Sequence, residues 1–256
     1  EFAEDSSGNA GASMSAYAAN IGMKAHIFTP NSTPENKKNQ IKIFGSELHL
    51  IDGPRENSTI EVKKFTELTG INYLSHNYNP FFIEGMKSFG HEVFNEFHAD
   101  ITDIIIPVGN GSLLIGAVKA YEELIKLKKI SKMPKMHCIQ VEGFSPIVKK
   151  FNSSEWKFNE FSKTLAGGIA VSNPPRLNQV IESIRNSNGK AIEVSEANIL
   201  NWHKELASWG FLSEITCAAA LAGTEKLIES GVINEKSNIV IPITGSGLKD
   251  LDKVNF

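Results

Sequence analysis

The sequence predicts an α/β fold, in which a mostly parallel sheet is covered by helices on both faces. Short apolar or β-branched runs alternate along the chain with stretches whose apolar residues recur at helical spacing. Strand–helix alternation of this kind favours parallel strands. The chain has 256 residues and is 41% hydrophobic, so it can form one large domain or two modest ones. The runs predicted as strands are residues 24–29, 47–51, 72–74, 102–108, 136–141 and 238–243.

Helices are expected between these runs, and glycines mark where two of them end. Gly22 and Gly45 each follow a stretch of helical period, and glycine readily adopts the left-handed conformation that closes a helix. Pro34 suits the first turn of the second helix, because its missing N–H would have no partner there. The segments predicted as helical are residues 12–19, 34–44, 81–97 and about 112–124.

A polar, proline-terminated break at residues 75–80 separates the first strand–helix units from the next long helix. We therefore expect a smaller α/β lobe over residues 1–80, which carries the loop Ser6–Gly11. A larger α/β lobe over residues 81–256 carries the loops that begin at Gly109 and Thr244. Two lobes would leave a cleft between them, where small-molecule sites are common.

Composition and charge exclude several kinds of partner. Nucleic-acid binding calls for a clustered basic surface, and the nearly balanced net charge of −3 argues against it. The lysines between Lys126 and Lys135 suit a solvated helix end. The apolar stretch Ile104–Val108 is far shorter than the roughly 20 residues that span a bilayer. Cys138 and Cys217 stand far apart in apolar contexts, so they are expected to be core residues of a protein in a reducing, cytoplasmic compartment.

Three glycine-bearing polar loops carry the functional signal: Ser6–Gly11, Gly109–Ser112 and Thr244–Gly247. The first two are expected where a helix begins, and the third is expected to close a strand. Glycines let a phosphate approach the backbone, and the free N–H groups and dipole of a helix start attract its charge. Together the loops suggest one pocket for a phosphorylated, planar cofactor. Singly, the second could be a tight turn, and the first could be a helix cap made by Ser7 or Asn9.

Other motifs fit poorly. Ala117-Val118 occupies the place of the P-loop lysine and hydroxyl residue, and Gly116 arrives two residues late for a dinucleotide fingerprint. Asn95 stands where the second histidine of a zinc helix would follow His91, so no metal site is expected. Ile243 replaces the first glycine of a nucleophile elbow. The cofactor phosphate is therefore not expected to belong to a nucleotide.

Four segments taken together resemble one known family. They are Glu4–Ser13, Pro107–Gly111, Thr164–Ala170 and Ile243–Lys249, in the same order as in the family and over essentially the whole chain. They are similar to threonine synthase and its relatives, pyridoxal-phosphate enzymes that share the tryptophan synthase β-subunit fold. The resemblance implies a two-lobed, three-layer α/β fold of fold type II and pyridoxal 5′-phosphate as cofactor. It also implies a lyase of amino-acid metabolism that acts on a small amino-acid substrate as a homodimer.

The resemblance assigns roles to residues of the loops. Asn9 is expected to hydrogen-bond the cofactor's 3′ oxygen, and Thr244 to face its pyridine nitrogen. A neutral hydroxyl at that nitrogen suits elimination and replacement better than transamination. The residues expected to hold the substrate carboxylate are Ser6, Ser7 and the Ala10 backbone, and those expected to cradle the phosphate are Gly109, Asn110, Gly111, Ser112 and Leu113.

One group of the family's site has no counterpart in this sequence. Family enzymes hold the cofactor as a Schiff base on a lysine upstream of the Ser-Gly-Asn loop, and the sequence starts at Glu1. Lys24, after the first helix, and Lys249, beyond the Thr244 loop, are not placed as substitutes. We therefore expect this chain alone, as a truncated member of the family, to lack the catalytic lysine.

A second departure concerns the substrate. The family segment N-P-Y-R-x-E-G-x-K supplies an arginine for the phosphate of phosphohomoserine, and here Asn79–Lys87 places Phe82 at that position. This removes a bidentate, charge-assisted contact, for which Arg176 is a candidate replacement. The first expectation is conversion of O-phosphohomoserine to threonine and phosphate. The alternatives are a serine or threonine dehydratase, a β-replacement enzyme of the cysteine synthase type, or a non-catalytic protein that keeps the cofactor fold.

Overall fold

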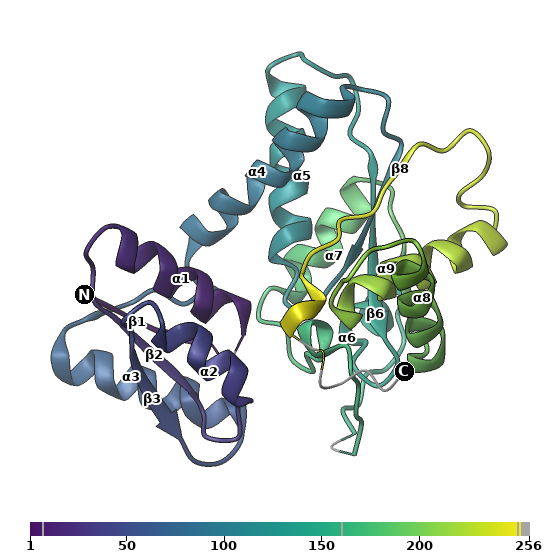
Figure 1. The fold of residues 1–256 in the computed structure, drawn as a ribbon. Coiled ribbons are helices and arrows are strands. Elements are labelled where there is room, and N and C mark those ends of the chain that lie inside the picture. The colour runs from purple at the N-terminus through teal and green to yellow at the C-terminus, as the bar shows by residue number, and fades with distance from the viewer. Residues whose placement is uncertain (7, 160, 250, 252–256) are drawn as a thin grey trace. The chain divides into compact units, whose positions relative to one another are not determined.

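The computed structural model describes every residue of the chain except 7, 160, 250 and 252–256. The chain divides into two compact units beside the polar break at residues 75–80 (Figure 1). Unit 1 is Glu1–Asn79 and unit 2 is Pro80–Phe256. Each unit contains one four-stranded parallel sheet with helices, so the predicted fold class is confirmed.

Unit 1 is built on a sheet with the strand order β3-β2-β1-β4. Side chains alternate between the two faces of each strand. Phe2 and Ile27 therefore pack against α1 and α2 on one face, while Ala3 and Phe28 pack against Val62 of α3 on the other. The strands are β1 (Phe2–Asp5), β2 (Ala25–Pro30), β3 (Glu47–Ile51) and β4 (Asn72–Tyr73), and the helices are α1 (Asn9–Asn20), α2 (Glu35–Lys42) and α3 (Arg55–Thr69).

Unit 2 is built on a sheet with the strand order β7-β6-β5-β8. The strands are β5 (Asp103–Pro107), β6 (Lys135–Val141), β7 (Ala191–Val194) and β8 (Ile239–Val240). The α-helices are α4 (Pro80–Phe97), α5 (Ser112–Lys126), α6 (Pro146–Phe151), α7 (Leu177–Asn186), α8 (Glu196–Ser208) and α9 (Ile215–Glu229), and two short 3₁₀ helices are η1 (Gly167–Ile169) and η2 (Gly247–Lys249).

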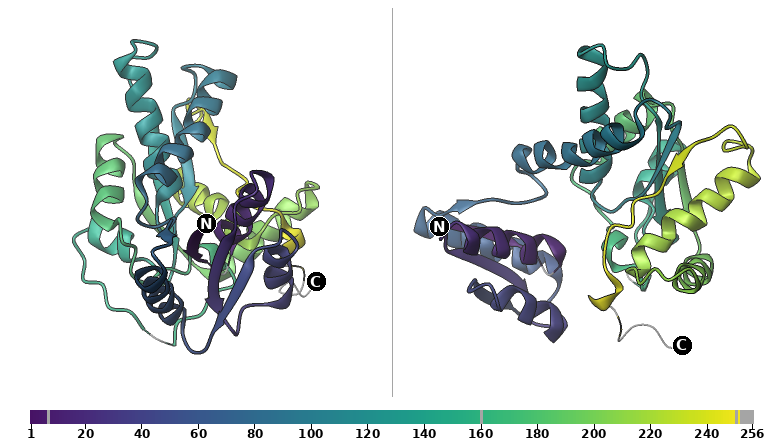
Figure 2. Two further views of the ribbon diagram at one scale, coloured as in Figure 1. Left: turned by 90° about the vertical axis from the view of Figure 1, so that its left-hand side faces the viewer. Right: turned by 45° about the horizontal axis from the view of Figure 1, so that its top comes forward.

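The central strand β5 of unit 2 contributes to two hydrophobic cores. Ile104 and Ile106 pack on one face with residues of α4, α5 and α7, whereas Ile105 packs on the other with α8 and α9. Figure 2 shows the green helices α8 and α9 on one side of this sheet and the blue and teal helices α4 and α5 on the other. Burial on both faces explains why β5 is a continuous apolar run in the sequence.

Three strands differ from the sequence prediction. β1 was not among the predicted strands, because its Glu4 and Asp5 are buried charges, which are rare in proteins. β7 was not among them either, and its Glu193 interrupts the apolar pattern. β8 ends at Val240, so the loop at Thr244 follows irregular chain and does not close a strand, contrary to the prediction.

The predicted helix starts need two small corrections. The N-cap of α1 is Gly8, so Asn9 is the first helical residue and not the cap, while Ser7 lies outside the described residues. The N-cap of α2 is Pro34, so Glu35 begins that helix. The helix ends are as predicted, because Gly22 and Gly45 adopt positive φ angles of 68° and 77°.

Several expectations about single residues are also met. Cys138 and Cys217 are free and buried, and burial raises the pKa of the Cys138 thiol. Lys126 and Lys128 are exposed at and just beyond the end of α5. None of the described helices is both long and apolar enough to cross a membrane.

Candidate active site

The segment Gly109–Leu113 runs from the loop after β5 into the first turn of α5 in unit 2. At Gly109 and Gly111 the backbone lies so close to neighbouring atoms that a side chain would not fit. A methyl group on Gly109 would lie 2.8 Å from the carbonyl oxygen of Gly168, and one on Gly111 would lie 2.2 Å from Cγ2 of Val180. Gly111 also has a φ of 86°, which favours glycine. Both positions therefore require glycine.

The first turn of α5 is suited to an anion. Its N-cap is Gly111, which has no side chain to bond the N–H groups of the first turn. These N–H groups and the positive end of the helix dipole attract negative charge. Ser112 and Leu113, in this turn, are half-buried.

A buried glutamine holds this end of β5 in place. The Gln140 side chain donates from Nε2 to the Val108 carbonyl at 3.3 Å. Its Oε1 accepts from the backbone N–H groups of Ile147 and Val148 at 2.9 and 3.1 Å. The loop therefore leaves a strand end that is fixed to the start of α6.

The start of α9 contacts both the Gly167-Gly168 turn and the Thr244 loop. Thr216 Oγ1 accepts a hydrogen bond from the Gly168 N–H at 3.1 Å, and Gly168 is the residue that closes on Gly109. Cys217 is the next residue of α9, and its Sγ lies 3.4 Å from Thr244 Oγ1. The Gly109 loop, the Gly167-Gly168 turn and the Thr244 loop are thus brought together within unit 2. Sequence reasoning missed Thr216 and gave Cys217 only a core role.

The Thr244 loop is fixed on the residues that precede α9. The Glu214 N–H donates to the Gly245 carbonyl at 2.9 Å, and the Gly247 N–H donates to the Leu212 carbonyl at 3.0 Å. A methyl group on Gly245 would lie 2.5 Å from the carboxyl carbon of Glu214. This packing determines where the Thr244 hydroxyl lies.

In unit 1, the loop from Ser6 to Gly11 joins β1 to α1. The Ser6 N–H donates to the Phe28 carbonyl at 3.1 Å, and Ser6 Oγ accepts from the Gly8 N–H at 3.3 Å. A methyl group on Gly11 would lie 2.8 Å from the Ser6 carbonyl oxygen, so α1 packs directly on the loop. Ser6 is buried, Ala10 is half-buried and Asn9 is exposed.

Two buried carboxylates, Glu4 and Asp5, support this loop, and the sequence analysis did not single them out. Arg55 donates from Nη1 to Asp5 Oδ2 at 2.7 Å and from Nη2 to the Asp5 carbonyl at 2.6 Å. Tyr73 also donates to Asp5, and its pKa is raised by burial and by this bond. Glu4 accepts from the His76 N–H and contacts the His76 ring, and burial raises the pKa of Glu4. The residues just before Ser6 are therefore held firmly.

The structure shows the surroundings of the residues that were considered for the substrate phosphate and as substitutes for the catalytic lysine. Phe82 lies half-buried in the first turn of α4. Arg176 is the N-cap of α7, and its Nη1 donates to Gln179 Oε1 at 3.1 Å. Lys24 forms an ion pair with Glu47 at 2.8 Å, and Lys249 Nζ lies 4.0 Å from Glu214 Oε1.

A profile of the family described as "Pyridoxal-phosphate dependent enzyme" matches residues 1–245. The chain belongs to this family. It is 31% identical over 252 residues to the threonine synthase of Methanocaldococcus jannaschii, covering 96% of this chain and 62% of that protein. It is 32% identical over 249 residues to the threonine synthase of a Bacillus species, covering 96% of this chain and 68% of that protein. The chain thus spans about two thirds of the length of these relatives.

Two solved structures share the fold of this chain. Maize serine racemase superposes with a TM-score of 0.85 at 21% identity, covering 98% of this chain and 74% of that one. The processed form of threonine deaminase isoform 2 from Solanum lycopersicum gives a TM-score of 0.82 at 21% identity, covering 96% of this chain and 65% of that one. The predicted fold of pyridoxal-phosphate enzymes is therefore confirmed.

The geometry of unit 2 fits the phosphate of pyridoxal phosphate. The first turn of α5 offers N–H groups to an anion, and its N-cap Gly111 has no side chain that would compete for them. Packing against Gly168 and Val180 keeps Gly109 and Gly111 as glycines at this turn. Thr244 carries a neutral hydroxyl. Its loop contacts Cys217 of α9, and the neighbouring Thr216 bonds Gly168, which packs on Gly109. The first turn of α5 thus fits a cofactor that carries a phosphate.

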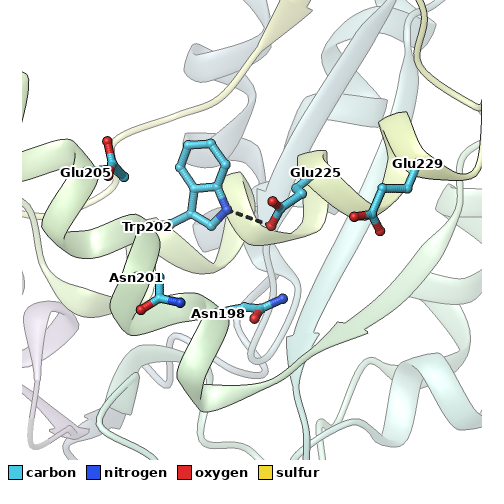
Figure 3. Close-up of a pocket in the computed structure, with 6 residues that line it drawn as sticks. All are labelled: Asn198, Asn201, Trp202, Glu205, Glu225 and Glu229. Carbon is cyan, nitrogen blue, oxygen red and sulfur yellow. Dashed lines mark hydrogen bonds between the residues drawn. The ribbon is translucent and has the colours of Figure 1, made fainter.

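Another pocket of unit 2 does not fit this cofactor (Figure 3). It has a volume of about 310 Å³ and lies between α8 and α9, where Trp202 Nε1 donates to Glu225 Oε2 at 3.0 Å. Three glutamates line it, so a phosphate would be repelled. The lining residues are Asn198, Asn201, Trp202, Glu205, Glu225 and Glu229, and none of them is a predicted site residue.

Proposed function

We propose that the Gly109 loop binds the phosphate of pyridoxal phosphate mainly through backbone N–H groups. The residues assigned to this cradle are Gly109, Asn110, Gly111, Ser112 and Leu113. The positive φ angle of Gly111 and the first turn of α5, which no side chain caps, support this assignment. A fixed backbone cradle orients the cofactor at little entropic cost, because no long side chain has to be ordered.

Thr244 is proposed to accept or donate a hydrogen bond at the pyridine nitrogen of the cofactor. Its contact with Cys217 Sγ supports this role, because it positions the hydroxyl. Bound pyridoxal phosphate withdraws electrons from the substrate's α carbon, and a neutral partner at its nitrogen moderates that effect. This moderation suits elimination and replacement reactions.

In unit 1, Asn9 is proposed to hydrogen-bond the 3′ oxygen of the cofactor, and Ser6, Ser7 and the Ala10 backbone to hold the substrate carboxylate. The support is local. α1 starts at Asn9, so its first-turn N–H groups favour an anion. The buried Asp5 and its bonds to Arg55 keep the loop in one conformation.

The proposed reaction is conversion of O-phosphohomoserine to threonine and phosphate. Sequence similarity carries this proposal, because threonine synthases of several organisms are 28–32% identical to the chain over 96% of its length. The loops that hold cofactor and substrate would orient the substrate's α carbon against the cofactor. The leaving phosphate requires a further cationic partner, for which Arg176 is a candidate.

A second candidate follows from Phe82. This half-buried phenylalanine stands where an arginine would bind the substrate phosphate by family resemblance. An aromatic ring cannot supply the bidentate contact of a guanidinium. Phe82 therefore favours a substrate without phosphate, such as serine, threonine or O-acetylserine, undergoing elimination or β-replacement.

One comparison of substrates tests both candidates. The natural protein at full length, loaded with pyridoxal phosphate, is assayed for phosphate release from O-phosphohomoserine and for 2-oxo acid release from serine and threonine. Release of phosphate with a kcat/KM at least about 100-fold above that for serine or threonine supports threonine synthase activity. The reverse ratio supports the dehydratase. Phe82→Arg is expected to shift the ratio toward O-phosphohomoserine.

We also propose that the protein is a cytoplasmic homodimer. The free, buried cysteines fit a reducing compartment. Exposed apolar side chains such as Phe81 and Leu68 offer surface for a second copy. Sedimentation equilibrium of the full-length protein tests this, and a mass equal to that of one chain at micromolar concentration would contradict it.

A further inference from the structure

Three side chains with metal-binding atoms converge on one face of the sheet in unit 1. His26 of β2 pairs in register with Glu47 of β3, and His49 follows two residues after Glu47. Side chains two residues apart in a strand point to the same face, so all three lie on the face covered by α3. One donor atom from each of the three side chains lies within 4.8 Å of the other two, so these described residues could hold a metal ion together.

The separations of the donor atoms match a tetrahedral metal site. His26 Nδ1 lies 3.2 Å from His49 Nε2 and 3.6 Å from Glu47 Oε2. His49 Nε2 lies 3.4 Å from Glu47 Oε1. Ligands at about 2.0–2.1 Å from a tetrahedral zinc ion are roughly 3.3 Å apart. The two distances to Glu47 involve its two oxygens, and one donor atom from each of the three side chains lies within 4.8 Å of the others. A small rotation of the exposed carboxylate would therefore place one oxygen with the two nitrogens around an ion.

A second carboxylate orients the most buried ligand. His26 Nε2 lies 3.0 Å from Glu1 Oε2, on the side of the ring that points away from His49. A proton on Nε2 that is donated to Glu1 leaves Nδ1 with a free lone pair. Histidines that bind metals commonly donate their other N–H to a carboxylate in this way, which fixes the tautomer.

The aromatic rings of Phe28 and Phe65 pack against the two imidazole rings. Phe28 stacks on His49 with ring centroids 4.2 Å apart, and Phe65 of α3 lies 4.9 Å from His26 and 5.4 Å from His49. Glu47 is nearly half exposed, so water can reach the group from its side. The arrangement therefore has two fixed nitrogen donors, one accessible oxygen donor and room for a water ligand.

Lys24 opposes metal binding and has to be accounted for. Its Nζ pairs with Glu47 Oε2 at 2.8 Å, and both side chains are about half exposed. An exposed ion pair of this kind contributes little free energy, so a divalent ion can displace the lysine from the carboxylate. Removing the Lys24 charge is expected to tighten metal binding.

We propose that unit 1 binds a divalent transition-metal ion, zinc foremost, through His26 Nδ1, His49 Nε2 and one oxygen of Glu47, with water as the fourth ligand. Imidazole and carboxylate donors in tetrahedral geometry suit zinc. The site lies at the amino ends of β2 and β3, whereas the Ser6–Gly11 loop follows the carboxyl end of β1. The ion therefore joins two parallel strands and stabilises unit 1 without taking part in cofactor chemistry.

Zinc affinity of the protein tests the proposal directly. The metal-free protein is titrated with Zn²⁺ against a chromophoric chelator, and Co²⁺ is used as a spectroscopic probe. We expect one tight site per chain and a visible Co²⁺ absorption typical of four-coordinate nitrogen and oxygen ligands. His49→Asn and Glu47→Gln are each expected to weaken binding at least about tenfold, as losses at metal sites commonly do. Lys24→Met is expected to strengthen it.

Matched controls separate the site from general surface binding. His91→Asn removes a half-exposed histidine paired with Glu123, and Glu61→Gln removes a half-exposed glutamate of unit 1 paired with Lys64. Both are expected to leave zinc affinity within about twofold. Thermal melting in the presence of a chelator checks that each variant folds. If His49→Asn does not fold, the zinc affinity of Glu47→Gln tests the proposal.

A second readout uses stability. An ion that binds only the folded state raises the melting temperature. At the same zinc concentration, zinc is expected to raise that of the wild type and of the two control variants by similar amounts, and to raise that of Glu47→Gln less. The proposal is overturned by absence of specific Zn²⁺ and Co²⁺ binding in the wild type, or by equal affinity in wild type and Glu47→Gln.

Discussion

Single glycines in the candidate site act by excluding side chains. Gly109 and Gly85 illustrate the contrast, because both lie in unit 2 and only one is crowded. A methyl group on Gly109 would meet the Gly168 carbonyl oxygen at 2.8 Å, whereas one on Gly85 in α4 would meet no atom within 4 Å. Both residues are glycines in the sequence, and only the packing around them shows that Gly109 is required and Gly85 can be replaced.

Replacing Gly109 by alanine is therefore expected to weaken cofactor binding. Overpacking at such a contact costs about 1–3 kcal/mol, which corresponds to roughly 5- to 150-fold in affinity if the loop moves to relieve it. Fluorescence titration of the full-length protein with pyridoxal phosphate measures this. Gly85→Ala serves as the control, because alanine favours a helix and meets open space. Equal affinities in the two variants would contradict the prediction.

A buried histidine of unit 2 has a tautomer fixed by its neighbours. His137 and Asp103 are both fully buried, and His137 Nε2 lies 2.8 Å from Asp103 Oδ1. Nδ1 accepts a hydrogen bond from the Lys190 N–H at 3.2 Å, so it carries no proton. The imidazole is therefore neutral with its proton on Nε2. Burial lowers the pKa of His137 in spite of Asp103.

This assignment gives a dependence on pH with a definite sign. Because the folded pKa lies below the unfolded value of about 6.5, the unfolded chain takes up a proton first as pH falls. His137 therefore lowers the free energy of unfolding as pH falls from about 7 through 6.5 toward its folded pKa. Nitrogen-15 NMR is expected to show that the neutral Nε2–H form predominates at pH 6.5, where an unfolded histidine would be about half protonated. A titration midpoint at or above 6.5 would contradict it.

At the scale of elements, the sequence predicts those whose pattern is local. β5 and α5 are evident because a buried apolar run passes through glycines into a helical period. β1 is not evident, because it is short and ends in two charges. Glu4 and Asp5 are satisfied there by His76, Arg55, Thr59 and Tyr73, which are distant in sequence. Contacts of this kind leave no periodic signal.

The candidate site shows the same limit. The Gly109 loop is predictable because its glycines, the strand end and the helix start are adjacent in the chain. The role of α9 is not predictable, because Thr216 contacts Gly168 across 48 positions and Cys217 contacts Thr244 across 27. In the sequence these residues belong to an alanine-rich helix that is indistinguishable from an ordinary buried one.

Thr216→Val is expected to loosen the Gly167-Gly168 turn. Valine keeps the shape and removes the acceptor of the Gly168 N–H, a loss of about 1 kcal/mol of unfolding free energy. Hydrogen exchange at the Gly168 amide is expected to become faster, and pyridoxal phosphate to bind more weakly. Urea unfolding and exchange measured by mass spectrometry provide the readouts.

Thr224→Val is the matched control in the same helix. Both threonines are 7% exposed, but Thr224 Oγ1 donates to the Ala220 carbonyl within α9. That bond duplicates a helix bond, so its loss is expected to change stability by less than about 0.5 kcal/mol. Unchanged exchange at Gly168 in Thr216→Val would refute the role of α9 as the link between the loops.

At the scale of the whole molecule, the two units have separate cores. The clusters of unit 2 draw their buried residues from α4 to α9 and from its own sheet. The clusters of unit 1 draw theirs from residues before Asn79. A segment with a core, a complete sheet and covered faces meets the physical requirements of a domain. The phosphate cradle and Thr244 both belong to unit 2.

Residues 80–256 expressed alone are therefore expected to fold. Their central strand is buried on both faces by residues of the same segment, so removing unit 1 leaves both cores of unit 2 intact. We expect one cooperative thermal transition by circular dichroism and dispersed amide signals by NMR. Weak binding of inorganic phosphate, reduced by Gly109→Ala, would show that the cradle is formed without unit 1. A broad, non-cooperative transition would show instead that unit 2 depends on unit 1 for its fold. Residues 1–79 have smaller clusters and bury less surface, so they are expected to be less stable alone, and Zn²⁺ is expected to stabilise them.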